Sequence, residues 1–351
     1  MPGRTASHRV GRVSQADRHP FSQLTPDVVL DALSGVGLAV DGRLMGLNSY
    51  ENRVYQAMLD DAEPVVAKFY RPGRWSEAQI REEHAFSAEL VADDIPVVAP
   101  TVLQGDTLHR LTVPAEGAPP TVFWFSVCPR RGGRRPELDD PEVLEWIGRF
   151  LARMHLVGER QPFAHRPALD VQSHGHEPLA LLLQQHVPPE SRTAWQQAAQ
   201  EALAMVEQAM REPYAGLRLH GDAHPGNILW TPVEMPQGGP HFVDLDDART
   251  GPAVQDLWML PSGDRRDRTM QWSALLEGYT SMRSFDAREL ALVEPLRTLR
   301  LLHYSAWLAQ RRDDPAFAEH FGWFGTPSYW QEQVRILHDQ IEAMQEAPLM
   351  L

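Results

Sequence analysis

Residues 128–136, CPRRGGRRP, divide this sequence into two parts with different patterns. Before them, short runs of β-branched and aromatic residues alternate with polar breaks, most clearly at residues 121–127 (TVFWFSV), which is typical of strands. After them, apolar residues recur every three or four positions, as from Val143 to Met154, which is typical of buried helices. The glycines and prolines of the dividing segment favour turns. The sequence therefore predicts an α+β protein with two lobes.

The expected boundaries follow from this division. We expect an N-terminal lobe of strands and a helix at 24–127, a hinge at 128–136 and a mainly helical C-terminal lobe at 137–351, with residues 1–23 as a flexible, basic lead. The expected strands are residues 44–47, 53–58, 65–70, 108–113 and 121–127, and the expected helices are residues 28–33, 76–92, 143–154, 192–211 and 288–312. The apolar side of the helix at 76–92 should comprise Ile80, Phe86, Leu90 and Val91.

Composition excludes several classes of protein. The 33 Lys and Arg residues against 47 Asp and Glu residues give a net charge of −14, which argues against a nucleic-acid binder because such proteins need a basic surface. The single cysteine, Cys128, excludes an intrachain disulfide and a cysteine zinc cluster. No apolar run approaches the roughly 18 residues that span a bilayer, and the first twenty residues lack a secretory pattern. We therefore expect a soluble, cytoplasmic monomer.

Polar residues gather at one non-helical island of the C-terminal part. HGDAHPGNILW (220–230) and HFVDLDD (241–247) each combine a short apolar strand with acidic or amide side chains, and together they predict a hairpin. Carboxylate and amide oxygens, as in Asn227 and Asp244, are the ligands that Mg²⁺ prefers. Asp222 is placed to accept a proton from a hydroxyl group. Such a set suits phosphoryl transfer, in which positioning and charge neutralisation do most of the catalysis.

The motifs resemble a known family. HGDAHPGN resembles the catalytic loop of the aminoglycoside-phosphotransferase branch of the protein-kinase superfamily, and FVDLDD occupies the place of the kinase D-F-G segment. NSYENRVYQ (48–56), VAKFYRPGRW (66–75), the EEH of the following helix and VDLDDARTGPAVQDLWML (243–260) resemble more narrowly the bacterial stress response kinase A family of serine/threonine protein kinases. The resemblance extends from about residue 24 to residue 348 and implies a two-lobe, protein-kinase-like fold.

The resemblance also implies a role for each matching residue. Asp222 matches the catalytic proton acceptor, and Asn227 and Asp244 match the two magnesium ligands. The remaining matches concern the nucleotide: Lys68 for the α- and β-phosphates, Glu83 (with Glu82 second) for the partner of that lysine, and Ser49 for a contact in the first hairpin.

Several positions depart from the kinase pattern. A glycine-rich G-x-G-x-x-G loop is missing, and Leu245 and Asp246 replace the phenylalanine and glycine of D-F-G. His224 stands where many protein kinases have a lysine, and it is expected either to contact phosphate or to pack in the loop. If residues 243–247 form a strand, the alternation of side chains places Asp246 on the same side as Asp244. Asp246 is therefore a secondary candidate near the metal site.

Four further polar residues are assigned structural roles. His155 and His220 are expected to be satisfied by hydrogen bonds, Asp256 to anchor or cap the helix that begins at QDLWML, and Cys128 to act as a small apolar residue near the hinge.

Taken with the resemblance, these observations predict an ATP- and Mg²⁺-dependent serine/threonine protein kinase, and self-phosphorylation stays open. Two alternatives remain. The pattern HGDxHxxN is shared by small-molecule kinases that act on aminoglycosides, choline or homoserine. A nucleotide-binding pseudokinase adaptor is disfavoured, because a pure binder does not need a base such as Asp222.

Overall fold

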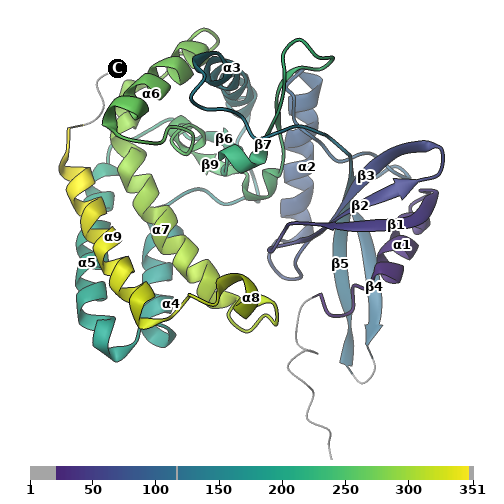
Figure 1. The fold of residues 1–351 in the computed structure, drawn as a ribbon, viewed down its shortest axis with the longest axis horizontal. Coiled ribbons are helices and arrows are strands. Elements are labelled where there is room, and N and C mark those ends of the chain that lie inside the picture. The colour runs from purple at the N-terminus through teal and green to yellow at the C-terminus, as the bar shows by residue number, and fades with distance from the viewer. Residues whose placement is uncertain (1–20, 116–117, 348–351) are drawn as a thin grey trace, which may run out of the picture.

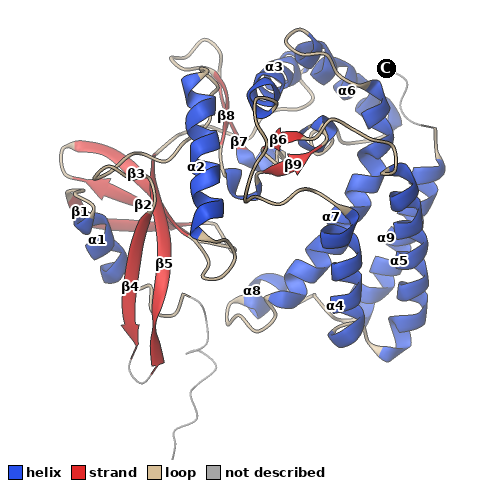
Figure 2. Ribbon diagram, turned by 180° about the vertical axis from the view of Figure 1, so that it is seen from behind, coloured by secondary structure: helices blue, strands red, loops and turns tan. Residues whose placement is uncertain are grey.

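A computed structural model of the chain describes residues 21–115 and 118–347. The lead predicted for residues 1–23 lies almost entirely outside the described residues. The described chain forms a sheet-containing N-terminal lobe and a larger helical lobe, which lie on opposite sides of helix α2 in both ribbon views (Figures 1 and 2).

The N-terminal lobe is built on an antiparallel sheet, which within the described residues has five strands in the order β1-β2-β3-β5-β4. Its strands are β1 (Val40–Leu47), β2 (Arg53–Leu59), β3 (Ala62–Phe69), β4 (His109–Ala115) and β5 (Ala118–Pro129). Helix α1 (Pro26–Gly35) is capped at its N-terminus by Thr25, whose hydroxyl accepts a hydrogen bond from the backbone N–H of Val28. Its apolar side joins Phe69, Phe123 and Phe125 in the core of this lobe.

Helix α2 (Glu77–Ala92) connects the two lobes. Ser76 and Gln79 form a capping box that fixes its first turn. Phe86 and Leu90 are fully buried and belong to the core of the helical lobe. The prediction for Val91 was wrong: its side chain is 47% exposed, because consecutive residues of a helix lie about 100° apart and Leu90 already faces the core.

The helical lobe contains the other α-helices of the described residues. They are α3 (Pro141–Gly158), α4 (Glu177–Gln185), α5 (Pro189–Ala209), α6 (Arg265–Thr280), α7 (Val293–Gln310), α8 (Phe317–Phe321) and α9 (Pro327–Gln345). Helices α3 and α6 cross closely at two glycines. A Cβ atom on Gly148 would lie 2.1 Å from the backbone oxygen of Leu275, and one on Gly278 would lie 2.1 Å from that of Glu145. Helices α4, α5, α7 and α9 enclose a second core, whose largest side chains are Trp195 and Trp330.

Two small β-pairs interrupt the helical lobe. Strand β6 (Leu217–Leu219) pairs with β9 (Arg249–Gly251), and β7 (Ile228–Thr231) pairs with β8 (Gly239–Phe242), both antiparallel. The second pair is the hairpin predicted from the polar island. In the described part of the chain, no helix combines the length and the apolar character needed to cross a membrane.

Candidate active site

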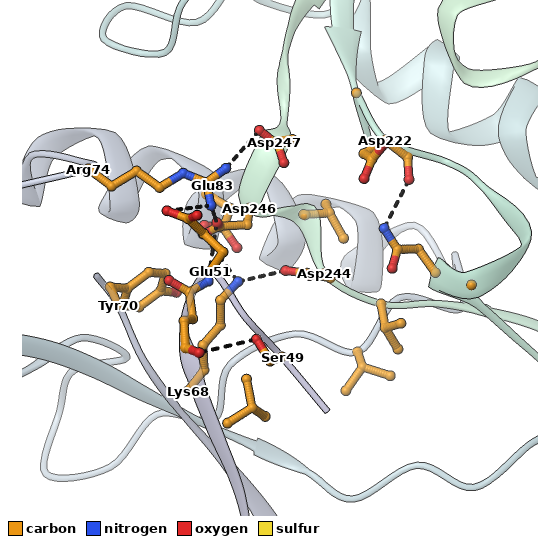
Figure 3. A pocket seen from close by; sticks show the side chains of 18 of the residues that line it. Ser49, Glu51, Lys68, Tyr70, Arg74, Glu83, Asp222, Asp244, Asp246 and Asp247 are labelled. Carbon is orange, nitrogen blue, oxygen red and sulfur yellow. Dashed lines mark hydrogen bonds and ion pairs between the residues drawn. The ribbon is translucent and has the colours of Figure 1, made fainter. Parts of the chain in front are cut away.

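A cleft of about 760 Å³ lies between the two lobes (Figure 3). The N-terminal lobe contributes the turn at 47–52, one side of β3 and the end of β5 near Cys128. The helical lobe contributes residues of the loop at 221–229, the segment at 243–249 and one side of α7. All six residues predicted for the site line this cleft: Ser49, Lys68, Glu83, Asp222, Asn227 and Asp244.

The loop that carries Asp222 is anchored by the buried carboxylate of Asp256. Asp256 is fully buried and accepts hydrogen bonds from the backbone N–H groups of His220 and Gly221, both at 2.8 Å. His155 lies 3.1 Å from the same carboxylate. Gly221 has φ +85°, and a Cβ there would lie 2.1 Å from the backbone oxygen of Asp247, so a side chain is excluded. Asp256 therefore anchors the loop, and the helix predicted to begin at QDLWML is not formed, because residues 253–256 are a 3₁₀ turn followed by further turns.

The two histidines predicted to be structural are satisfied as expected. His155 is fully buried, and its second ring nitrogen lies 2.8 Å from the hydroxyl of Tyr279. His220 is also fully buried, and its Nε2 lies 3.0 Å from the backbone oxygen of Val243. Both rings therefore hold the loop to its neighbours.

Asn227 and His224 shape the turn after Asp222. Nδ2 of Asn227 donates to the backbone oxygen of Asp222 at 3.0 Å, which leaves the side-chain oxygen of Asn227 available as a ligand. His224 accepts a hydrogen bond from the backbone N–H of Gly226, and its Nε2 lies 3.5 Å from Oδ2 of Asp222. His224 thus packs within the loop, one of the two roles expected for it.

Asp244 follows β8 in an unusual backbone conformation. Its φ is +62°, in the left-handed region, and residues 245–247 then form a single 3₁₀ turn. The backbone N–H of Val243 donates to the backbone oxygen of Asn227 at 3.0 Å, which brings Asp244 and Asn227 to adjacent segments. The strand alternation used to place Asp246 was therefore wrong, because these residues are not a strand. The 3₁₀ turn nevertheless directs Asp246 into the cleft.

Lys68 joins the sheet to this segment (Figure 3). Its Nζ lies 2.7 Å from Oδ1 of Asp244 and 3.2 Å from Oδ1 of Asp246. Burial disfavours the charged ammonium, but these carboxylates and Glu83 outweigh burial and raise the pKa of Lys68 well above its usual value. Burial likewise acts to raise the pKa of Asp246, but Lys68 and Arg74 lower it to about 2. Both groups are therefore charged at neutral pH.

The pairing predicted between Lys68 and Glu83 is not observed. Among the described residues, Lys68 forms its ion pairs with Asp244 and Asp246, and none with Glu83 within 4.0 Å. Glu83 is 4% exposed, and burial raises its pKa to about 7 despite the nearby charge of Lys68. Glu82, the second candidate, faces away and accepts hydrogen bonds from backbone N–H groups at Ala164, His165 and Arg166. Sequence spacing alone did not reveal that two aspartates would compete for the lysine.

Ser49 lies in the turn that replaces a glycine-rich loop. Its hydroxyl donates to the backbone oxygen of Asn52 at 3.3 Å, so the turn is closed by a side chain. Asn52 is buried and donates to Oδ2 of Asp246 at 3.2 Å. Oε2 of Glu51 accepts from Nε1 of Trp307 at 2.9 Å and lies 2.5 Å from Nε of Arg311. Tyr50 adds a hydrogen bond from its hydroxyl to Asp314 at 3.3 Å, so the turn is tied to the helical lobe through Tyr50, Glu51 and Asn52.

Sequence reasoning missed two arginines of the cleft. Arg74 lies 2.7 Å from Asp246 and 3.0 Å from Asp247. It belongs to the segment VAKFYRPGRW, whose resemblance to the family could have marked it as a candidate. Nη1 of Arg300, on α7, lies 2.5 Å from Oδ1 of Asp222. Seventy-eight positions separate those two residues, and no local pattern indicates that they meet.

The oxygen donors near Asp244 fit a divalent metal. The part of the chain that the structure describes holds no group of three or more His, Cys, Asp or Glu residues suited to a metal ion. Mg²⁺, however, is commonly bound by one or two carboxylates together with phosphates and water. The side chain of Asp244 is 51% exposed, and like the amide oxygen of Asn227 it is a hard donor on the cleft wall.

Comparisons with known proteins agree with this architecture. The phosphotransferase enzyme family matches residues 44–293. Among solved structures, an amicoumacin kinase in complex with AMP-PNP and Ca²⁺ is 19% identical, with a TM-score of 0.70 over 91% of this chain and 93% of that one. A microcompartment-associated aminopropanol kinase is 20% identical, with a TM-score of 0.66 over 91% and 97%. The predicted two-lobe, kinase-like fold is confirmed, and the chain is a phosphotransferase-family kinase.

Curated relatives identify the family of this chain more specifically. Stress response kinase A of Escherichia coli K12 is 45% identical over 94% of this chain and 97% of its own. A protein of Salmonella typhimurium LT2 named serine/threonine protein kinase RdoA is 43% identical over the same shares. The chain belongs to the stress response kinase A family.

Proposed function

We propose that this protein is an ATP- and Mg²⁺-dependent serine/threonine protein kinase. The observation that carries the proposal is the convergence of Lys68, Asp222, Asn227 and Asp244 on one cleft, in a chain 43% identical to a protein named as a serine/threonine protein kinase. The amicoumacin kinase of similar fold was solved with a nucleotide and a divalent cation, which supports the same kind of ligands here.

In this proposal each cleft residue has one task. Asp222 accepts the proton of the acceptor hydroxyl, whose oxygen attacks the γ-phosphorus of ATP as the bond to the ADP oxygen breaks. Lys68 neutralises negative charge on the α- and β-phosphates, and the turn at 48–52 covers them. Asn227 and Asp244 would hold Mg²⁺, which neutralises phosphate charge when bound.

A small-molecule kinase is the second candidate. The solved structures with similar folds include kinases of amicoumacin and aminopropanol, although identities near 20% establish only the fold. A hydroxyl of a serine and one of a small alcohol present the same proton to Asp222, so the reaction itself does not separate the candidates.

Transfer of label from γ-labelled ATP decides between them. The protein should label serine or threonine on a generic protein substrate or on itself, identified by phosphoamino-acid analysis, and Asp222→Asn should abolish the signal. Labelling of an aminoglycoside, choline or an amino alcohol, with no phosphoserine or phosphothreonine on any protein, would establish the second candidate instead.

A further inference from the structure

The acidic residues of the cleft are almost all neutralised by cations. Among the described lining residues, five carboxylates each lie within 4.0 Å of an arginine or lysine: Glu51, Asp222, Asp244, Asp246 and Asp247. The sixth, Glu83, is buried behind Lys68, and its pKa is raised to about 7 by burial. A pocket that recognises an ammonium group needs a carboxylate available to pair with it. The described cleft presents none on the side of Asp222.

Arg300 is the cation on that side. It comes from the exposed part of α7, its side chain is 44% exposed, and Nη1 lies 2.5 Å from Oδ1 of Asp222. A guanidinium group has five N–H donors in a fixed plane. Within the described residues, the side chain of Arg300 donates one hydrogen bond, to Asp222. Its other N–H groups therefore remain available to a second acceptor. Asp222, which would accept the proton of the acceptor hydroxyl, therefore lies beside an arginine that can bind another anion.

The other residues of α7 that line the cleft add no negative charge. Leu296, His303, Tyr304 and Trp307 continue the cleft wall on the same side of the helix. Burial and the nearby Arg249 lower the pKa of His303 to about 4, so its ring is neutral. Tyr304 is 45% exposed and stacks on Trp307 with ring centroids 5.7 Å apart. This wall is therefore apolar and aromatic around one exposed positive charge.

We infer that Arg300 is a specificity residue that binds an anionic group next to the acceptor hydroxyl, so that a serine or threonine with an acidic neighbour is the preferred substrate. The inference rests on the proposed function, because it takes Asp222 as the residue that receives the hydroxyl. An acceptor with a carboxylate near its hydroxyl can pair with Arg300 while the hydroxyl donates to Asp222. An ammonium group at the same place meets the guanidinium charge and is rejected.

Matched peptides test the inference. Three serine peptides identical except for flanking aspartate, asparagine or lysine are phosphorylated with γ-labelled ATP. The wild-type KM should be lowest for the aspartate peptide, by about fivefold relative to the asparagine peptide, as is typical of a partly exposed ion pair. Arg300→Gln should lose this preference, and Arg300→Glu should reverse it towards lysine. Equal KM values for the three peptides in the wild type, or an unchanged preference in Arg300→Gln, would overturn the inference.

Two controls separate the possible failures. Arg288 is 77% exposed and pairs with Asp286 away from the cleft, so Arg288→Gln should keep the wild-type preference. If no peptide or protein is labelled, small alcohols replace them: an anionic hydroxy acid and a cationic amino alcohol. Phosphorylation of the hydroxy acid that depends on Arg300 would support the anion site and overturn the proposed protein substrate. Phosphorylation of the amino alcohol alone would overturn both.

Discussion

The two sides of the cleft hold their charges in different ways. On the side of Lys68, the lysine pairs with Asp244 and Asp246, Arg74 also pairs with Asp246, and the group joins both lobes. On the other side, Asp222 pairs with one exposed arginine from α7. Figure 3 shows Asp222 standing apart from the group around Lys68. The first, centred on the buried Asp246, is the buried side of the cleft, and the second, whose Arg300 is 44% exposed, is the open side.

This difference fits a division of labour in the proposed kinase. A nucleotide is the same in every reaction cycle, so a rigid and preorganised set of charges suits it. An acceptor varies, and its side of the cleft needs fewer fixed contacts. Mutations on the buried side should therefore change stability and nucleotide binding, whereas mutations on the open side should change turnover and acceptor choice.

The largest expected effect is on the open side. Asp222→Asn removes the proposed proton acceptor but keeps its shape, so turnover should fall by about 10²–10⁴. Calorimetry with a non-hydrolysable ATP analogue should give an affinity close to that of the wild type, because Asp222 is remote from Lys68.

Lys68→Ala provides the contrast. It should weaken binding of the ATP analogue, since the phosphates lose their main cation. Strongly weakened nucleotide binding in Asp222→Asn would contradict the division between the two sides.

The second expected effect is on the stability of the buried side. Asp246 is 3% exposed and compensates both Lys68 and Arg74, so Asp246→Ala removes one carboxylate partner from each of two largely buried cations. Removing one partner of a buried ion pair typically costs about 3–5 kcal/mol. Urea denaturation should show a loss of this order. Glu332→Ala, in a pair that is half exposed on α9, should cost less than about 1 kcal/mol.

Much of this arrangement was predictable from local patterns. Periodicity and capping residues predicted α1, α2 and α3, and the motif around residues 220–247 predicted the hairpin and the aspartates that face the cleft. The partners of Lys68 and Asp222 were not predictable, because they depend on how α7 and the 3₁₀ turn pack across the cleft. Arg300 is one of two arginines on α7, and its sequence neighbours do not distinguish it from Arg297.

The third prediction concerns pH. Burial raises the pKa of Glu83 to about 7, whereas an unfolded glutamate titrates near pH 4.3. The folded protein therefore keeps a proton that the unfolded chain has released, and the stability from this proton is lost as the pH rises from about 4.3 through 7. Glu83→Gln stays neutral, so it should be more stable than the wild type at pH 8, by on the order of 1–3 kcal/mol.

Its neighbour should behave in the opposite way. Burial acts to raise the pKa of Glu82, but hydrogen bonds from the backbone at 164–166 lower it, so Glu82→Gln should lose stability above pH 5. Thermal melts of both variants between pH 4.5 and 8 measure the two slopes. If Glu83→Gln kept the wild-type slope, Glu83 would be ionised in the fold at neutral pH.

The smallest expected effect tests whether the turn over the cleft is held by the opposite lobe. Glu51 contacts Trp307 of α7 and Arg311, the residue directly after α7, with a side chain that is 13% exposed. Glu51→Gln keeps an acceptor oxygen but loses the charge, so the KM for ATP should rise by about fivefold, as expected for roughly 1 kcal/mol. Arg311→Gln should give a smaller rise, because Trp307 still donates to Glu51, and the two changes should be less than additive, because both weaken the contact between Glu51 and Arg311. A double-mutant cycle in KM measures this coupling. Fully additive effects would mean that the ion pair between Glu51 and Arg311 does not position the turn.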